Sequence, residues 1–99
     1  MQLQNKRCVI TGAASGIGAA IALLLAREGA KLVLADRDAD KLGSVVAQCQ
    51  QLGAVCQGVV ADVGEVTGAT AAVDHCLAHF AGIDVLVNNA GMLTQARCT

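Results

Sequence analysis

Apolar and polar positions follow one another in blocks that predict four strands separated by three helices. Short apolar runs bounded by turn residues are typical of parallel strands buried on both faces. They predict strands at Arg7–Thr11, Lys31–Asp36, Val55–Ala61 and Asp84–Asn88. Longer stretches with helical periodicity predict helices over Ser15–Glu28, from an N-cap at Asp38 or Asp40 to Leu52, and over Glu65–Ala81. We expect loop from Asn89 onward.

Each predicted helix carries an apolar stripe that we expect to face the sheet. The expected inward residues are Ile17, Ala20, Ile21, Leu24 and Leu25 in the first helix, Leu42, Val45, Val46 and Cys49 in the second, and Val66, Ala69, Thr70, Val73, Leu77 and Phe80 in the third. Gly68 lies inside the third helix, where glycine costs about 1 kcal/mol relative to alanine. Glycines that follow the helices, Gly29, Gly53 and Gly82, are expected to end them.

Strands that alternate with helices at this spacing predict a parallel sheet with helical crossovers. Crossovers of this kind are right-handed, so the first two helices are expected on one face and the third on the other. The predicted fold class is α/β, a three-layer α/β/α sandwich with strand order 3-2-1-4. In such a sheet, ligands bind where the strand order reverses, at the carboxyl end of the first strand.

The residues at that strand end have the layout of a dinucleotide site. Gly12, Gly16 and Gly18 follow the first strand and open a helix, and Asp36 ends the next strand. Gly12 is expected to allow the chain to leave the strand, Gly16 to let the backbone approach a pyrophosphate, and Gly18 to let the helix pack closely on its strand. N–H groups at the helix start would face the phosphates, and Asp36 would accept from the adenosine ribose hydroxyls. On the glycines alone, a tight turn without a ligand is the alternative.

Two further strand ends carry polar residues. Asp62 and Val63 follow the third strand, where the carboxylate and the Val63 N–H suit an adenine ring, although Asp62 is equally suited to cap the next helix. Asn88, Asn89, Ala90 and Gly91 follow the fourth strand. An asparagine pair there can tie neighbouring strands together, and Gly91 leaves room for a ligand against the backbone.

These motifs together resemble the short-chain dehydrogenase/reductase family over about Lys6 to Leu93. The residues that carry the resemblance are TGAASGIG, Asp36, Asp62 and NNAG. The resemblance implies a Rossmann-type, doubly wound fold and an oxidoreductase that transfers hydride between a nicotinamide and an alcohol or carbonyl substrate. The cofactor-binding residues it implies are Gly12, Ala14, Ser15, Gly16, Ile17, Gly18, Asp36, Arg37, Asp62, Val63, Asn89, Ala90 and Gly91.

The choice of cofactor depends on Asp36. A carboxylate at this position repels a 2′-phosphate and favours NAD over NADP. Arg37 could instead offer a charge to that phosphate, whereas the loop residues Ala13-Ala14-Ser15 add no basic group. We therefore expect NAD.

The catalytic residues that the resemblance implies, a Tyr-x-x-x-Lys motif with a serine and a later asparagine, have no counterparts here. The 99 residues contain no tyrosine, and no lysine follows Asp62. We assign no catalytic residue and no substrate. We expect residues 1–99 to be the N-terminal part of a single NAD(P)-binding domain, incomplete at its C-terminus and inactive alone. The alternatives are a short product that binds nucleotide or pairs with a full-length subunit, and a chain that does not fold by itself.

Composition and residue spacing argue against several other classes of function. A net charge of −1 offers no electrostatic attraction for nucleic acid or an anionic membrane. The five cysteines have no CxxC spacing and are expected to be reduced apolar fillers in a cytoplasmic protein. His75 and His79 are expected on a solvated helix face rather than at a metal, and Ser15 lacks a nucleophile-elbow context. A full-length relative of this kind is expected to be a homo-oligomer.

Overall fold

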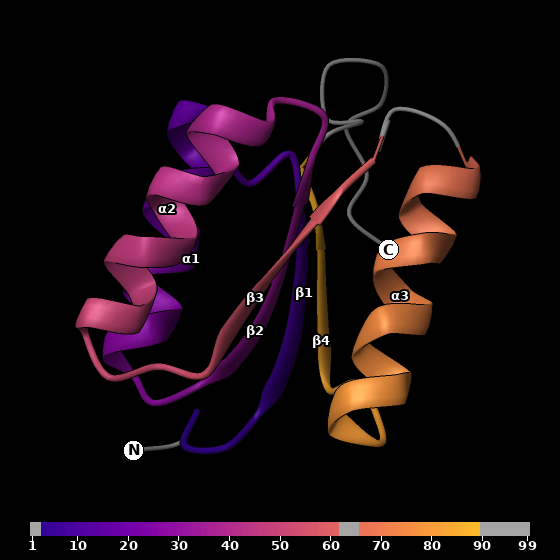
Figure 1. The fold of residues 1–99 in the computed structure, drawn as a ribbon. Coiled ribbons are helices and arrows are strands. Elements are labelled where there is room, and N and C mark those ends of the chain that lie inside the picture. The colour runs from indigo at the N-terminus through magenta and orange to yellow at the C-terminus, as the bar shows by residue number, and fades with distance from the viewer. Residues whose placement is uncertain (1–2, 62–65, 90–99) are drawn as a thin grey trace.

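The computed structural model describes residues 3–61 and 66–89, the side chains of residues 66 and 67 excepted, and contains all seven predicted elements (Figure 1). The strands are β1 (Arg7–Thr11), β2 (Lys31–Asp36), β3 (Cys56–Val60) and β4 (Val85–Asn88). The helices are α1 (Gly16–Arg27), α2 (Ala39–Gln51) and α3 (Val66–Phe80). Predicted and observed ends agree within one residue at every described boundary, Asp38 rather than Asp40 caps α2, and residues 62–65 before α3 lie outside the description.

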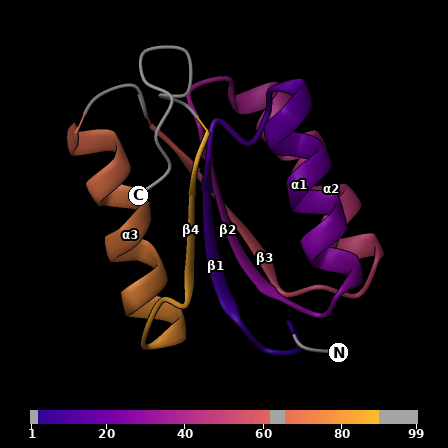
Figure 2. The same ribbon diagram turned by 180° about the vertical axis from the view of Figure 1, so that it is seen from behind.

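The four strands form one parallel sheet in the order β3-β2-β1-β4. Helices α1 and α2 cover one face and α3 covers the other, as the two opposite views show (Figures 1 and 2). The predicted three-layer, Rossmann-type α/β/α architecture and strand order are confirmed. The carboxyl ends of β1, β2 and β4 therefore meet at one edge of the sheet.

The central strand β2 joins two apolar cores. Leu32 and Leu34 pack with α1 and α2, whereas Val33 and Ala35 belong to the cluster under α3, and all four side chains are inaccessible to solvent. This is the burial expected of a strand covered on both faces, and it explains the uninterrupted apolar run in the sequence.

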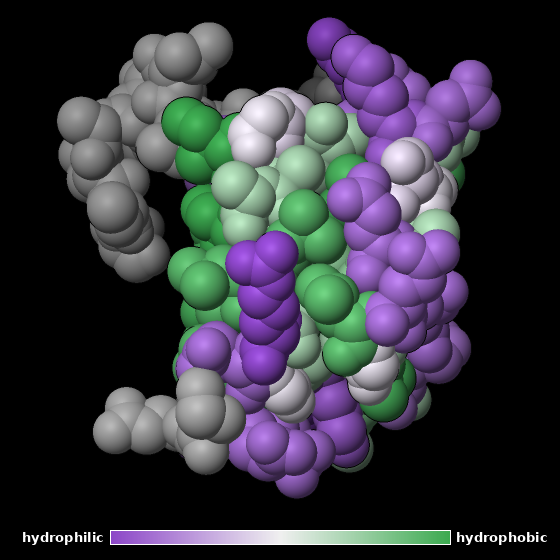
Figure 3. All heavy atoms as spheres, turned by 90° about the vertical axis from the view of Figure 1, so that its left-hand side faces the viewer, coloured by the Kyte–Doolittle hydropathy of each residue, from purple (hydrophilic) through white to green (hydrophobic). Residues whose placement is uncertain are grey.

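The predicted inward stripe of α1 is only partly right, because Ile21 and Leu25 pack against the core but the other three predicted residues are exposed. Ile17 and Leu24 are 61% and 56% exposed, and the residues buried against the sheet are Gly18, Ala22 and Ala26. These small residues recur every four positions, so the helix approaches the sheet on its narrowest side. Figure 3 shows the consequence, because hydrophobic side chains gather on the molecular face that α1 and α2 form. The stripe predicted for α2 is confirmed, with Leu42, Val45 and Cys49 buried and Val46 packed against them.

Helix α3 repeats this pattern. Its buried positions are Gly68, Ala72 and Cys76, whereas Thr70 is exposed and Leu77 is 46% exposed, contrary to prediction. Val73 is half-buried, and Phe80 packs on the α3 cluster as predicted. The Val66 side chain lies outside the described residues. Gly68 is thus an inward residue of α3.

The helix-ending glycines are only partly as predicted. Gly29 and Gly53 have φ of +87° and +90°, the left-handed conformation that suits glycine. After α3, however, Ala81 takes this conformation, with φ of +61°. Gly82 instead leaves room for the Arg7 guanidinium, which a Cβ on this residue would overlap.

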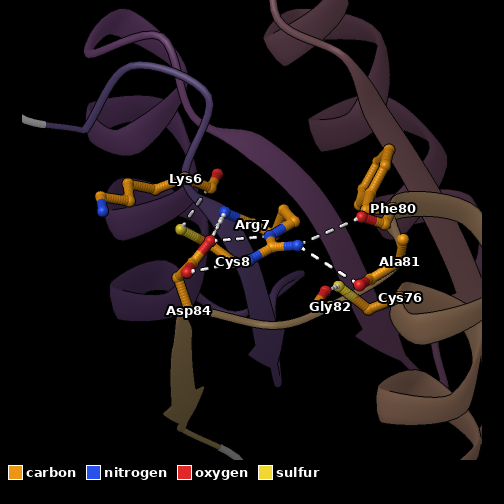
Figure 4. Close-up of polar contacts among 8 residues, drawn as sticks. All are labelled: Lys6, Arg7, Cys8, Cys76, Phe80, Ala81, Gly82 and Asp84. Carbon is orange, nitrogen blue, oxygen red and sulfur yellow. Dashed lines mark hydrogen bonds and ion pairs between the residues drawn. The ribbon is translucent and has the colours of Figure 1, made fainter.

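Arg7 links β1 to the start of β4 and to the end of α3, at the end of the sheet where the strands begin (Figure 4). Its Nε and Nη2 donate to the two carboxylate oxygens of Asp84, at 2.8 and 3.1 Å, and its backbone N–H also donates to Asp84. Its Nη1 donates to the carbonyls of Ala81 and Phe80 at the end of α3. These hydrogen bonds hold the pKa of the Asp84 carboxyl well below its usual value. The start of β4 and the end of α3 are therefore fixed to β1.

Candidate nucleotide-binding site

The loop that joins β1 to α1, Gly12–Ser15 and here called the glycine loop, lies at the carboxyl edge of the sheet. Gly12 has φ of +65°, so the predicted need for glycine at the strand exit is confirmed. The next residue, Ala13, is fully buried and donates its N–H to the Ala35 carbonyl of β2 at 3.1 Å. The loop is thus folded back over the end of β2 rather than projecting into solvent.

Ser15 is the N-cap of α1, yet within the described part of the chain its hydroxyl makes no capping hydrogen bond to the helix. The hydroxyl donates instead to the Gly12 carbonyl at 2.8 Å. The first intrahelical bond runs from the Ala19 N–H to the Ser15 carbonyl. N–H groups of a first helical turn have no intrahelical acceptor, and the helix dipole makes this end positive. The start of α1 is therefore chemically suited to an anion.

The two glycines of the first turn differ in what surrounds them. A Cβ on Gly18 would overlap the Gly12 carbonyl and lie 2.9 Å from Asn89 Nδ2, whereas a Cβ on Gly16 would meet nothing within 4 Å. Gly18 therefore permits the close approach of the helix to the loop and strand ends. Gly16 leaves the open side of the turn without a side chain, which is the arrangement that a bulky phosphate group requires.

Asp36 ends β2 and turns its carboxylate toward the glycine loop. Its Oδ2 accepts from the Ala14 N–H at 3.0 Å, and its Oδ1 accepts from the Asp38 N–H at 2.9 Å. A carboxylate oxygen has two lone pairs, so each oxygen retains one acceptor position. The Ala14 contact was not foreseen from the sequence, because a residue with no polar side chain gives no signal there.

Asn89, which follows β4, holds the other flank of the loop. Its Nδ2 donates to the Gly12 carbonyl at 3.1 Å and to the Ser15 hydroxyl at 3.0 Å. Beside it the Thr11 hydroxyl donates to Asn88 Oδ1 at 2.9 Å, so the asparagine pair ties β4 to β1 as predicted. The glycine loop is thus held from both sides by polar side chains.

The structure brings most of the predicted cofactor residues to this edge. Those it places around the ends of β1, β2 and β4 are Gly12, Ala14, Ser15, Gly16, Ile17, Gly18, Asp36 and Asn89. Arg37 is exposed beside them. Asp62, Val63, Ala90 and Gly91 lie outside the described residues.

The histidine pair lies elsewhere, on α3. The rings of His75 and His79 stack with centroids 4.0 Å apart, and His75 also hydrogen-bonds to Gln57 of β3. Burial, together with the neighbouring His79, lowers the pKa of His75. Only His79 is on a solvated face, so that prediction is wrong for His75, which is half-buried. Among the described residues no group of three or more potential ligands could hold a metal ion.

The described cysteines Cys8, Cys49, Cys56 and Cys76 are free and buried, as expected of apolar fillers. Burial raises the pKa of the Cys8 thiol to about 11. Cys98 lies outside the described residues. No helix in the described parts of the chain combines the length and the apolarity that crossing a membrane requires.

A parallel sheet with a glycine loop and an open helix start at its switch point defines a nucleotide-binding type of α/β protein. Comparison with known proteins makes this specific. Residues 6–99 match the short chain dehydrogenase family, and the chain belongs to that family, whose members use NAD or NADP.

Three similar proteins illustrate the relationship. The chain is 42% identical over 90 residues to 1,6-dihydroxycyclohexa-2,4-diene-1-carboxylate dehydrogenase of Acinetobacter baylyi, covering 91% of this chain and 34% of that protein. Glucose dehydrogenase of Caenorhabditis elegans superposes with a TM-score of 0.83 at 37% identity, covering 90% of this chain and 39% of the other. A short-chain dehydrogenase/reductase of Burkholderia phymatum in complex with NAD gives 0.81 at 38% identity, covering 87% and 31%. The chain thus spans about a third to two fifths of these relatives.

Proposed function

We propose that this chain is the dinucleotide-binding part of an NAD-dependent short-chain dehydrogenase. The observation that carries the proposal is the uncapped start of α1 behind a glycine loop that Asp36 and Asn89 hold in place. This arrangement fits a pyrophosphate, since open N–H groups and the helix dipole favour an anion. A relative that the chain resembles at 38% identity was solved in complex with NAD.

The proposed cofactor site keeps all the residues predicted from the sequence. They are Gly12, Ala14, Ser15, Gly16, Ile17, Gly18, Asp36, Arg37, Asp62, Val63, Asn89, Ala90 and Gly91. First-turn N–H groups of α1 would bind the phosphates, and the two free acceptor positions of Asp36 would take the adenosine ribose hydroxyls. When bound, a nicotinamide cofactor supplies the hydride acceptor or donor of the reaction.

Asp36 also supports NAD rather than NADP as the cofactor. Its carboxylate is fixed by two backbone N–H donors at the end of β2, so a 2′-phosphate there would meet a negative charge that does not turn away. Titration of the folded protein with NADH and NADPH, followed by nucleotide fluorescence, tests this. NADH should bind more tightly by about tenfold or more, which corresponds to about 1.4 kcal/mol. Equal or tighter NADPH binding would contradict the assignment and point to Arg37.

The residues of the proposed cofactor site identify neither a substrate nor a catalytic residue. Two of the relatives are named for a cyclohexadiene carboxylate and for glucose, so similarity to them does not identify one substrate for this chain. We propose that residues 1–99 form the N-terminal part of one domain, in the cytoplasm, and that the complete protein is a homo-oligomer acting on an alcohol or a ketone. Because the chain contains no tyrosine, it should bind NADH but not oxidise it with any carbonyl compound, and measurable turnover would overturn this.

A second candidate is a non-catalytic product that binds nucleotide or pairs with a full-length subunit. The observation that favours pairing is the edge strand β4, which has one strand neighbour among the described residues and an exposed Leu86. Edge strands of this kind can pair with another chain. Mixing the chain with a full-length relative and measuring the size of the product by chromatography tests it. A stable heteromer supports the candidate, and two separate peaks count against it.

A further inference from the structure

We infer that Asp36 is a positioning residue that holds the glycine loop in its binding shape before any nucleotide arrives. The inference deepens the proposed function and rests on it, because the loop's shape matters only if it receives phosphates. Asp36 reaches two segments at once. One carboxylate oxygen accepts from Ala14 of the glycine loop at 3.0 Å, and the other accepts from Asp38 at the start of α2, at 2.9 Å.

The rest of the loop shows why Ala14 needs this partner. Gly12 and Ser15 are held from the β4 side by Asn89, and Ala13 is held by the Ala35 carbonyl. Ala14 lies next to Ser15, the N-cap of α1, and its own side chain is a methyl group that can make no polar contact. Asp36 is the side chain that accepts from its N–H. The position of Ala14, and with it the direction in which the first N–H groups of α1 point, therefore depends on β2.

The charge of Asp36 strengthens this hold. Hydrogen bonds from a backbone N–H to a carboxylate are shorter and stronger than those between neutral groups. An asparagine at the same place has one uncharged acceptor oxygen in place of the two carboxylate oxygens that accept from Ala14 and Asp38. An alanine serves neither. Replacing Asp36 should therefore loosen the loop even in the absence of any nucleotide.

Amide hydrogen exchange, followed by nuclear magnetic resonance on the 15N-labelled chain without ligand, tests the inference. In Asp36→Ala the Ala14 amide should exchange about tenfold faster or more than in the unsubstituted chain, because it loses its acceptor, and in Asp36→Asn the increase should be smaller, because one uncharged acceptor oxygen remains. Asp38→Asn is the matched control. Asp38 is also an aspartate two positions further on, but its carboxylate accepts from Lys41 of α2, so Ala14 exchange should change by less than about twofold.

The Leu32 amide serves as the internal reference for global opening, because it donates to the Val55 carbonyl within the central sheet. Faster exchange at Ala14 with an unchanged rate at Leu32 supports the positioning role. An unchanged Ala14 rate, or an increase at Ala14 no larger than that at Leu32, overturns it. Since no nucleotide is present, failure of this test leaves NADH binding open, and failure of the chain to bind NADH leaves this result standing.

Discussion

Two helices begin side by side at the same edge of the sheet, and their first turns are built in opposite ways. At α2 the N-cap Asp38 accepts from the Lys41 N–H, and the first turn carries a second carboxylate, Asp40. At α1 the N-cap Ser15 turns its hydroxyl back to Gly12, and the first turn, Gly16–Ala19, has no charged residue. Both helices have a positive dipole end. Of the two, only α1 has no carboxylate in its first turn and, among the described residues, no side chain that caps its first-turn N–H groups.

This difference shows that a helix start suits an anion when the N-cap side chain does not accept from the first-turn N–H groups and no carboxylate neutralises the dipole. In α2 the Asp38 carboxylate accepts from the Lys41 N–H, and the carboxylates of Asp38 and Asp40 repel a phosphate. In α1 the cap's hydrogen bond is used to shape the glycine loop, and the loop in turn is held by Asp36 and Asn89. Substitutions at the start of α1 and at the start of α2 should therefore differ in their effects on the stability of the fold and on NADH binding.

The largest effect is expected at Gly18. A methyl group there would overlap the Gly12 carbonyl, so Gly18→Ala should lower the free energy of unfolding by about 1–3 kcal/mol, as overpacking does, and abolish NADH binding. Chemical denaturation and fluorescence titration measure the two effects.

Two other glycines serve as controls for this substitution. Gly43→Ala lies in α2 with nothing within 4 Å, and it should stabilise the chain by up to about 1 kcal/mol without changing NADH binding. Gly16→Ala should fold normally but bind NADH more weakly, since its methyl group would stand on the open side of the turn. If Gly18→Ala is tolerated like Gly43→Ala, the close approach of α1 to the loop is wrong.

The next effect is expected at Asn89. Replacing it with alanine removes two hydrogen bonds to the glycine loop and should cost about 1–2 kcal/mol of stability, together with weaker NADH binding. Asn88→Ala is the neighbouring control, because Asn88 bonds to Thr11 rather than to the loop, and it should affect stability more than binding. Equal loss of binding in both variants would mean that the strand end as a whole, and not the loop contact, matters.

The capped helix should respond differently. Asp38→Ala removes the N-cap of α2 and should lower stability by about 1 kcal/mol, while NADH affinity stays within about twofold. Thermal unfolding and the same titration measure both. A large loss of affinity on uncapping α2 would erase the distinction between the two helix starts.

The smallest effect on binding is expected at the opposite edge of the sheet. Arg7 lowers the pKa of Asp84 in the folded chain below its unfolded value of about 3.8, so the ion pair stabilises the fold above that pH and its contribution is lost as the pH falls below it. Asp84→Asn should flatten the dependence of stability on pH between about pH 5 and pH 2, and NADH affinity at neutral pH should not change. A dependence as steep as that of the unsubstituted chain would contradict the role of Arg7.

The sequence predicted the order of elements, the strand order and the strand-exit glycine, because each has a local or topological cause. The spacing of apolar residues did not predict which residues of α1 and α3 are most deeply buried. Apart from Arg27, α1 is apolar or glycine throughout, and the small residues Gly18, Ala22 and Ala26 face the sheet because they allow close approach. The hydrogen bonds from the glycine loop to Asp36 and Asn89 were also not predicted. They form only because the ends of β2 and β4 lie on either side of the loop. Only the folded chain brings these residues together.

Phosphate binding at the start of α1 is the central property of the proposed nucleotide site. The most direct test is to follow the backbone amide signals of the 15N-labelled chain while NADH is added. The Gly16, Ile17 and Gly18 amides should show the largest shifts, and those of Ala39, Asp40 and Lys41 at the start of α2 should stay nearly unchanged. Larger shifts at α2 than at α1, or none at either helix at millimolar NADH, would contradict the account.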